Sequence, residues 1–216
     1  MVELHSHSII SDGELTPSEL VRLACSMGYK GVVITDHVDT TNIYHVCKMM
    51  KGGIDKLSQN SPIPVLWGVE ITHVPPGIIK DIVKEARREG AKLVIGHGET
   101  ITEPVCEGTN KAFIEAGVDI LAHPGLISEE EVREASERGV FLEITTRKGH
   151  SYTNGHVVRL GKAFGARFVI CNDTHTYGDM LSVDMVSKIL IGAGLDEKES
   201  GMVLEESEKL FKRLLV

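Results

Sequence analysis

The sequence predicts an α/β fold, a barrel-like single domain of parallel strands with helices outside, and three observations support it. Short runs rich in valine, isoleucine and leucine alternate with longer amphipathic segments, which is typical of βα units around a parallel sheet. Seven such units follow one another along the chain. No low-complexity linker divides residues 1–216, so we expect one domain. An open doubly wound sheet has the same local pattern and stays open as an alternative.

Each predicted strand is short and apolar, and helical segments lie between the strands. The strand candidates are Val2 to His5, Gly31 to Thr35, Val65 to Ile71, Leu93 to Ile95, Ile120 to Ala122, Phe141 to Ile144 and Phe168 to Cys171. Two helices have clear start signals, since Thr16 can cap a helix that has Pro17 in its first turn, and Ser128 precedes three glutamates. Further helices are expected over residues 46–57, 78–88, 111–116, 156–164 and 183–216, the last with a break near Gly192.

Composition excludes several classes of protein. With 42% apolar and 25% charged residues, the chain is ordinary for a globular protein. It has no long apolar run, and its first residues lack the pattern of a signal peptide, so we expect a cytoplasmic protein with no membrane partner. The four cysteines are irregularly spaced and are expected to be buried free thiols. A formal net charge of −8 argues against extended nucleic-acid binding but is compatible with a small phosphorylated substrate.

Histidines and carboxylates stand at the carboxyl ends of the predicted strands, where parallel βα folds form their active face. Imidazole nitrogen and carboxylate oxygen bind Zn, Mn, Fe and related ions, and the absence of cysteine from this set disfavours a closed structural zinc site. Side chains two positions apart leave a strand on the same side, so His5 and His7 can face one ion, as can Asp173 and His175. The nine candidate ligands are His5, His7, Asp12, His37, Glu70, His97, His123, Asp173 and His175.

The other four histidines do not stand at predicted strand ends. They are His45, His73, His150 and His156. A single histidine is more often a hydrogen-bonded or loop residue than a ligand, so ordinary structural roles are favoured for these four.

The motifs follow one another in a characteristic order. They are His5-Ser6-His7-Ser8 with Ser11-Asp12-Gly13 and Leu15-Thr16-Pro17, then Thr35-Asp36-His37, Gly68-Val69-Glu70, His97, Ala122-His123-Pro124-Gly125 and Asp173-Thr174-His175. This series resembles the motifs of the PHP (polymerase and histidinol phosphatase) phosphoesterases over nearly the whole chain. The resemblance implies a distorted seven-stranded (β/α)7 barrel of the TIM type.

The resemblance also implies a site for two or three divalent metal ions, of Zn, Mn or Fe. His5, His7, Glu70 and Asp173 would hold one ion. Glu70 would bridge to a second ion completed by His97 and His123, and Asp12, His37 and His175 would hold a third, which makes the site trinuclear. Glu143, on the sixth strand, is not expected to bind metal.

The expected activity is metal-dependent hydrolysis of phosphate esters by a metal-bridging hydroxide, on a small metabolite such as histidinol phosphate or a nucleotide. His37 or His175 would assist the leaving group, and Asp12 belongs to the same catalytic set. Arg147 and Lys148 follow the sixth strand and could bind the phosphate, although a solvated loop pair fits them as well. This basic pair departs from the pattern of many relatives, which leaves the substrate open.

Two other functions stay open. Amidohydrolases also begin a βα barrel with HxH, but they usually carry a carboxylated lysine on the fourth strand, where this chain has His97. PHP-like barrels also serve as non-catalytic scaffold subunits of nucleic-acid enzymes, including a protein component of ribonuclease P. Such members often lose ligands, whereas this acidic chain has all nine candidates.

Overall fold

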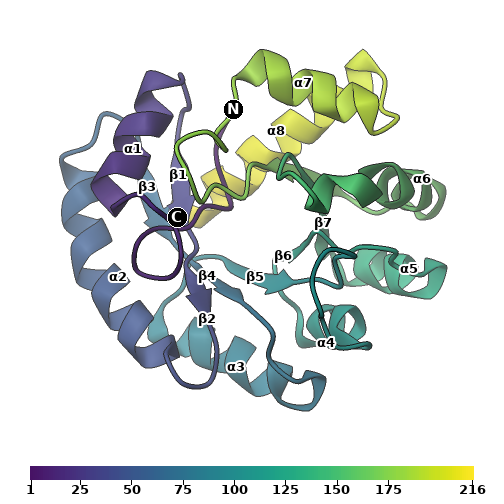
Figure 1. The fold of residues 1–216 in the computed structure, drawn as a ribbon, viewed down its shortest axis with the longest axis horizontal. Coiled ribbons are helices and arrows are strands. Elements are labelled where there is room, and N and C mark those ends of the chain that lie inside the picture. Colours follow the sequence, from purple (N-terminus) through teal and green to yellow (C-terminus); the bar gives the residue numbers. More distant parts are fainter.

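Eight short strands, all paired in parallel, lie at the centre of the molecule with α-helices around them (Figure 1). The computed structural model describes residues 1–216. The strands are β1 (Val32–Ile34), β2 (His37–Val38), β3 (Val65–Trp67), β4 (Val69–Ile71), β5 (Val94–His97), β6 (Ile120–Ala122), β7 (Phe141–Thr145) and β8 (Phe168–Cys171). β1 and β3 form a two-stranded sheet, and the other six follow the order β2-β4-β5-β6-β7-β8. The prediction of an α/β fold with a parallel sheet is confirmed.

The expected seven regular strands are replaced by these eight strands and two isolated bridges. The predicted strand from Val65 to Ile71 is interrupted at Gly68, where an added Cβ would lie 2.3 Å from the carbonyl oxygen of Leu93. The region after Gly31 continues past Thr35 into β2, which was not predicted. The region from Val2 to His5 forms no ladder of its own.

The first chain segment nevertheless has neighbours on both sides. Glu3 forms a parallel bridge with Val32, and Ser6 forms one with Thr174. The amide of Val33 donates to the carbonyl of Glu3 at 2.9 Å, and the amide of His7 donates to the carbonyl of Thr174 at 2.8 Å. The segment that carries His5 and His7 therefore lies between β1 and the chain that follows β8.

Eight α-helices and one 3-10 helix connect the strands. They are α1 (Pro17–Ser26), α2 (Ile43–Gln59), α3 (Pro76–Glu89), α4 (Thr109–Ala116), α5 (Glu129–Arg138), η1 (His150–Thr153), α6 (Asn154–Phe164), α7 (Val183–Gly192) and α8 (Glu197–Leu214). The helices predicted after Thr16 and Ser128 both begin with capping boxes, completed by Glu19 and Glu131. The predicted break near Gly192 separates α7 from α8.

Two apolar clusters hold these layers together. A cluster of 46 buried residues fills the space between the strands and the helices. A second cluster of 12 buried residues lies among the strands and includes Leu210 and Phe211 of α8. The Phe211 ring packs against Gly31, which precedes β1, and Glu208 pairs with the Met1 amino group at 2.9 Å. α8 therefore covers the amino ends of the strands and leaves the carboxyl ends accessible.

Two further expectations concern the thiols and the helices. All four cysteines are free, but only Cys47 and Cys171 are buried. Cys25, on α1, is half-buried, and Cys106 is exposed in the loop between β5 and α4. None of the helices combines the length and the apolar character that crossing a membrane requires.

Candidate metal centre

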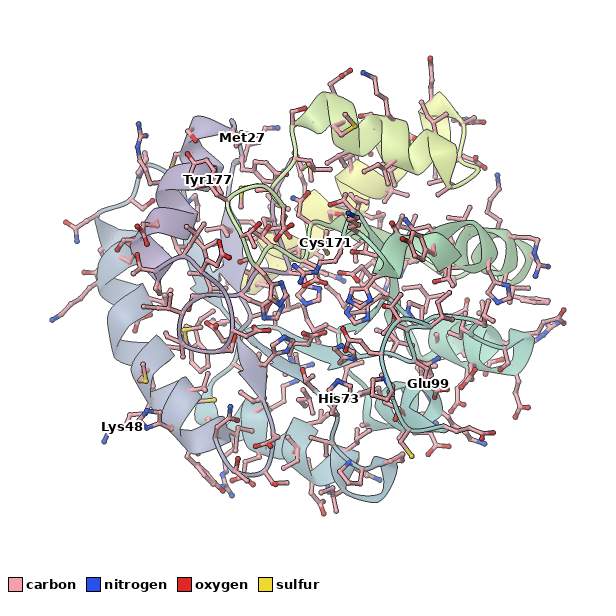
Figure 2. The ribbon with its side chains drawn as sticks, in the orientation of Figure 1. Met27, Lys48, His73, Glu99, Cys171 and Tyr177 are labelled. Carbon is pink, nitrogen blue, oxygen red and sulfur yellow. The ribbon has the colours of Figure 1, made fainter.

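A cavity of about 400 Å³ opens at the carboxyl ends of the strands, and all 14 residues that line it are polar. Seven of the nine predicted ligands are among them, namely Asp12, His37, Glu70, His97, His123, Asp173 and His175. The other two, His5 and His7, are fully buried. Imidazole rings gather at the centre of the molecule in Figure 2, and the labelled His73 lies at the edge of this gathering.

Four of the predicted ligands, His5, His7, Glu70 and Asp173, form the deep group. Glu70 Oε2 lies 3.3 Å from His5 Nε2 and 3.5 Å from His7 Nε2. Asp173 Oδ1 lies 3.2 Å from His7 Nε2 and 3.7 Å from His5 Nε2. Ligands bound to a tetrahedral zinc ion at 2.0–2.1 Å are about 3.3 Å apart, so these separations suit four ligands of one ion.

Several polar atoms of the deep group lack hydrogen-bond partners. The buried side-chain atoms without a partner include His5 Nε2, both ring nitrogens of His7, both carboxylate oxygens of Glu70 and Asp173 Oδ1. Each such atom costs about 1–3 kcal/mol when it is left unsatisfied. Four of these atoms come one from each residue of the deep group, and each nitrogen among them lies 3.2–3.7 Å from each oxygen. A divalent cation bound between them would compensate for the missing partners, so the residues present fit a metal ion.

Glu143 orients two members of the cluster without facing the cavity. The His5 Nδ1 lies 2.7 Å from Glu143 Oε1, and the amide of His123 donates to Glu143 Oε2 at 2.9 Å. A carboxylate on one ring nitrogen of a histidine fixes the ring and directs its other nitrogen toward the metal. Both oxygens of Glu143 are thereby used in positioning His5 and His123.

Backbone conformation turns two ligands into the cavity. His123 directly follows β6 and has a φ of 28°. Asp173 follows the end of β8 and has a φ of 52°. Non-glycine residues seldom adopt such angles, which cost about 1–3 kcal/mol and concentrate at functional sites. Next to His123, Gly125 has a φ of 62°, and an added Cβ there would lie 1.8 Å from the Glu99 carbonyl oxygen.

The electrostatics of the deep group favour bound positive charge. Burial lowers the pKa of His7 to about 3, so that this imidazole is neutral and has a free electron pair. Burial also disfavours protonated His5, but Glu70, Glu143 and Asp173 together raise the pKa of His5 well above its ordinary value. Three carboxylates around one imidazole therefore attract a cation to this point.

Asp12, His37 and His175 come together at the exposed side of the cavity. Asp12 Oδ1 lies 3.5 Å from His37 Nε2, and Asp12 Oδ2 lies 3.4 Å from His175 Nε2. The ring of His7 stacks on both histidines, with centroid distances of 4.1 Å. Asp36 fixes the loop that carries Asp12, because its carboxylate accepts hydrogen bonds from the amides of Ser8 and Ser11.

The trio expected for the second ion is only partly assembled. His123 Nε2 lies 3.4 Å from Glu70 Oε1. His97 instead directs its Nε2 toward Glu103 Oε2, at 3.1 Å. Glu103 is not among the residues predicted from the sequence. His97 and His123 are still neighbours, with ring centroids 4.4 Å apart.

Glu103 brings two more histidines to the rim. His73 Nε2 lies 3.1 Å from Glu103 Oε2, and His150 Nε2 lies 3.3 Å from Glu103 Oε1. Ordinary roles were expected for His73 and His150, yet both line the cavity together with Glu103. Their place in the chain could have identified these residues as part of the site. His73, Glu103 and His150 lie in the loops that follow the carboxyl ends of β4, β5 and β7, although not directly next to the strands.

The remaining two histidines lie elsewhere. His45 is exposed on α2. His156, on α6, places its Nε2 2.8 Å from the carbonyl oxygen of Ile127. Neither lines the cavity.

The two basic residues after β7 differ in position. Arg147 lines the cavity, and its Nη1 donates to the carbonyl of Asp173 at 3.1 Å and to Asp179 Oδ2 at 3.2 Å. Lys148 is exposed and does not line the cavity.

Two curated relatives resemble the chain along most of its length. An uncharacterised protein of Methanocaldococcus jannaschii is 40% identical over 215 residues, which cover 98% of this chain and 99% of the relative. Ribonuclease P protein component 3 of Methanosarcina mazei is 24% identical over 214 residues, which cover 88% of this chain and 80% of that protein.

Two solved structures share the fold. A chain of archaeal ribonuclease P with mature tRNA has a TM-score of 0.70 at 17% identity, covering 98% of this chain and 91% of that chain. Histidinol phosphate phosphatase from Lactococcus lactis, solved with Zn, L-histidinol and phosphate, has a TM-score of 0.60 at 16% identity, covering 90% and 94%. The PHP domain family matches residues 3–151, which hold seven of the nine predicted ligands. Together with the order of its motifs, this match shows that the chain belongs to the PHP domain family.

Proposed function

We propose that the protein is a metal-dependent hydrolase of phosphate esters. The observation that carries this proposal is the deep group, in which buried imidazole and carboxylate atoms converge without hydrogen-bond partners. Two or three divalent ions of Zn, Mn or Fe, when bound, would neutralise phosphate charge and lower the pKa of a bound water to about 7. Zinc is included in this choice because histidinol phosphate phosphatase from Lactococcus lactis, which shares the fold, was solved with Zn, L-histidinol and phosphate.

Arg147 is the residue placed to bind the phosphate. Its Nη1 is anchored on Asp173 and Asp179, while its Nη2 makes no hydrogen bond within the protein. An anchored guanidinium loses little conformational freedom when it binds an anion, and it offers paired donors to phosphate oxygens. Arg147 would thus orient a phosphate against the deep group.

His37 and His175 are placed to serve the leaving group. Both line the cavity, and both direct Nε2 toward Asp12, whose side chain is 55% exposed. An imidazole held by a carboxylate can keep a proton and transfer it to a departing oxygen. Asp12 would orient the two rings in this step.

The substrate we propose is a small phosphorylated metabolite. A cavity of about 400 Å³ is in the range of small-molecule sites, and its polar lining suits a hydrophilic compound. Histidinol phosphate and nucleoside monophosphates both have the required size class and polarity. The net charge of −8 is unfavourable for a long polyanion.

The proposal includes closure of the strands into a distorted barrel. The bridges of Glu3 to Val32 and of Ser6 to Thr174 support it, because they link β1 of the two-stranded sheet to the chain after β8, the last strand of the six-stranded sheet. Closure would explain how His5 and His7 reach the centre of the ligand cluster.

A panel of phosphate esters tests the activity directly. The purified chain, with its metal content measured, is assayed for phosphate release from histidinol phosphate, nucleoside monophosphates and p-nitrophenyl phosphate. We expect release from at least one ester, its loss on chelation and its recovery when metal is returned. A metal-loaded protein that hydrolyses no member of the panel would refute the proposal.

The ribonuclease P relative supports a second candidate, a subunit of an RNA–protein enzyme. The sequence match and the TM-score of 0.70 with an archaeal ribonuclease P chain both favour it. Binding of a ribonuclease P RNA and of a precursor tRNA at low salt separates the two candidates. Phosphatase activity without RNA affinity supports the first candidate, and salt-sensitive RNA binding by a protein without phosphatase activity supports the second.

A further inference from the structure

A buried hydrogen-bond network is centred on Asn172, which lies between β8 and the predicted ligand Asp173. Asn172 and Glu3 are both fully buried. The side-chain Nδ2 of Asn172 donates to Glu3 Oε2 and to the Tyr29 hydroxyl, the second at 2.6 Å. The backbone amide of Asn172 donates to the same carboxylate of Glu3 at 3.2 Å. Asn172 is therefore bound to the first chain segment, which lies 169 positions away in the sequence.

The side-chain oxygen of Asn172 joins two more segments to this network. Oδ1 accepts from Thr146 Oγ1 at 3.0 Å and from the amide of Leu181 at 3.3 Å. A carboxylate can only accept and a backbone amide can only donate, so Glu3 and Leu181 together fix which way the Asn172 amide group faces. The two donor and two acceptor positions of this side chain are thus all used. The first segment, the chain after β7 and the chain before α7 meet at this one residue.

Glu3 connects two ligands of the deep group through the backbone. Its Oε1 accepts from the amide of His5 at 2.9 Å and from the amide of Asn172 at 3.2 Å. In the deep group, His5 Nε2 and Asp173 Oδ1 lie 3.7 Å apart. The pair of Glu3 and Asn172 therefore holds the backbone of one ligand next to the residue that precedes the other.

Asp173 depends on this backbone support, because Oδ1 of its side chain is buried without a hydrogen-bond partner. Its φ is 52°, an angle that non-glycine residues keep only where the surrounding contacts hold them there. On one side of Asp173 those contacts come from Asn172. On the other side, Arg147 donates to the Asp173 carbonyl at 3.1 Å.

We propose that Asn172 is a positioning residue for the deep group. By tying the chain before Asp173 to Glu3, it holds the Asp173 carboxylate where this ligand can share an ion with His5. Asn172 does not line the cavity, so it acts on metal affinity without touching the substrate. The inference rests on the metal ion of the proposed function. Replacing residues that support metal ligands in this way typically weakens metal binding by about 10–100-fold.

Zinc binding by the full chain, measured by competition with a chromogenic chelator, tests this role without an activity assay. Asn172→Leu roughly keeps the side-chain volume and removes its hydrogen bonds, so at least one zinc equivalent should bind about tenfold more weakly. Thr146→Val and Tyr29→Phe each remove one hydroxyl that contacts Asn172, and each should weaken the same equivalent to a smaller extent. These two milder variants decide the question if Asn172→Leu does not fold, because unchanged zinc Kd values in both would overturn the proposal.

Asn154→Leu is the matched control. Asn154 is also buried, and its side chain hydrogen-bonds both the amide and the carbonyl of Thr145, which is not adjacent to a predicted ligand. This variant should lower the free energy of unfolding and leave every zinc Kd unchanged. If Asn154→Leu weakened zinc binding as much as Asn172→Leu, the effect would follow from lost stability, and the proposal would be overturned.

Ester hydrolysis by the same proteins separates this proposal from the proposed function. Weaker zinc binding in Asn172→Leu, together with no hydrolysis by the zinc-loaded wild type, would support the role of Asn172 and refute the hydrolase. Hydrolysis by the wild type, together with unchanged zinc Kd values in Asn172→Leu, would overturn the role of Asn172 and leave the hydrolase standing.

Discussion

At the amino ends of the strands, Leu210 and Phe211 of α8 pack among buried apolar residues, whereas at the carboxyl ends a cavity is lined entirely by polar ones. The first end contributes stability through burial of apolar surface. The second end holds unpartnered buried atoms and two ligands with positive φ, which oppose folding when no ion is bound. The same strands thus have a stabilising end and a functional end. Substitutions at the functional end should lower activity more than stability, and substitutions at the stabilising end should lower stability more than activity.

The largest effect is expected from Glu70→Gln at the functional end. Glu70 lies within 3.5 Å of His5 and His7, so losing one charged oxygen should weaken the ion of the deep group. We expect kcat/KM to fall by about 10³-fold, equivalent to about 4 kcal/mol of transition-state stabilisation. The thermal midpoint of the metal-free protein should change little, and a variant with wild-type turnover would remove Glu70 from the metal site.

Phe211→Ala, at the stabilising end, should lower the free energy of unfolding and leave kcat/KM nearly unchanged. Phe211 is 3% exposed, and truncating a buried phenylalanine costs about 3–5 kcal/mol. Denaturant unfolding measures this loss, while kcat/KM below the unfolding transition should stay within about twofold of wild type. Leu215→Ala is the matched control, because Leu215 is 46% exposed just after α8 and should cost less than about 0.5 kcal/mol. Equal costs for the two variants would contradict the role given to the apolar end.

Metal removal should increase the difference in stability between the two ends, because the buried ligand atoms then lack a partner. An ion present at 100 times its Kd stabilises the folded state by about 2.7 kcal/mol, so chelation should lower the unfolding midpoint. The decrease should be smaller in Glu70→Gln, which has less metal to lose. Calorimetry with and without chelator measures both, and an identical decrease in the two proteins would place the stabilising ion elsewhere.

A smaller effect is expected from Arg147→Ala. Because Arg147 is anchored on Asp173 and Asp179 at the cavity wall, its loss should raise KM by about tenfold, or about 1.4 kcal/mol, with a smaller change in kcat. Steady-state kinetics on the preferred ester separates the two constants. An unchanged KM would return Arg147 to a structural role.

The smallest effect is expected from Lys148→Ala, the neighbouring control. Lys148 is exposed and outside the cavity lining, where solvent and salt screen its charge. We expect kcat/KM to change by less than about twofold. A change as large as that of Arg147→Ala would show that the loop after β7 moves Lys148 onto the substrate.

Local patterns were enough to predict much of this molecule. Alternating βα segments, the capping boxes at Thr16 and Ser128, and the two-residue spacing of His5 and His7 all depend on neighbours within a few positions. Because active residues gather at the carboxyl ends of parallel strands, the nine candidate ligands could be predicted to lie on one face. That is why the family, the parallel α/β class and a metal-binding face could be inferred before any coordinates were considered.

The tertiary structure decided what depends on distant partners. Close approach of Leu93 interrupts the predicted strand at Gly68, and Glu143 reaches His5 across 138 positions of sequence. Glu103 joins His73 and His150, and His150 meets Thr100 across 50 positions. No local period encodes such contacts, because they arise only when loops after different strands meet at one rim. The sequence therefore determined which residues can bind metal, and the packing of the strands determined which of them share an ion.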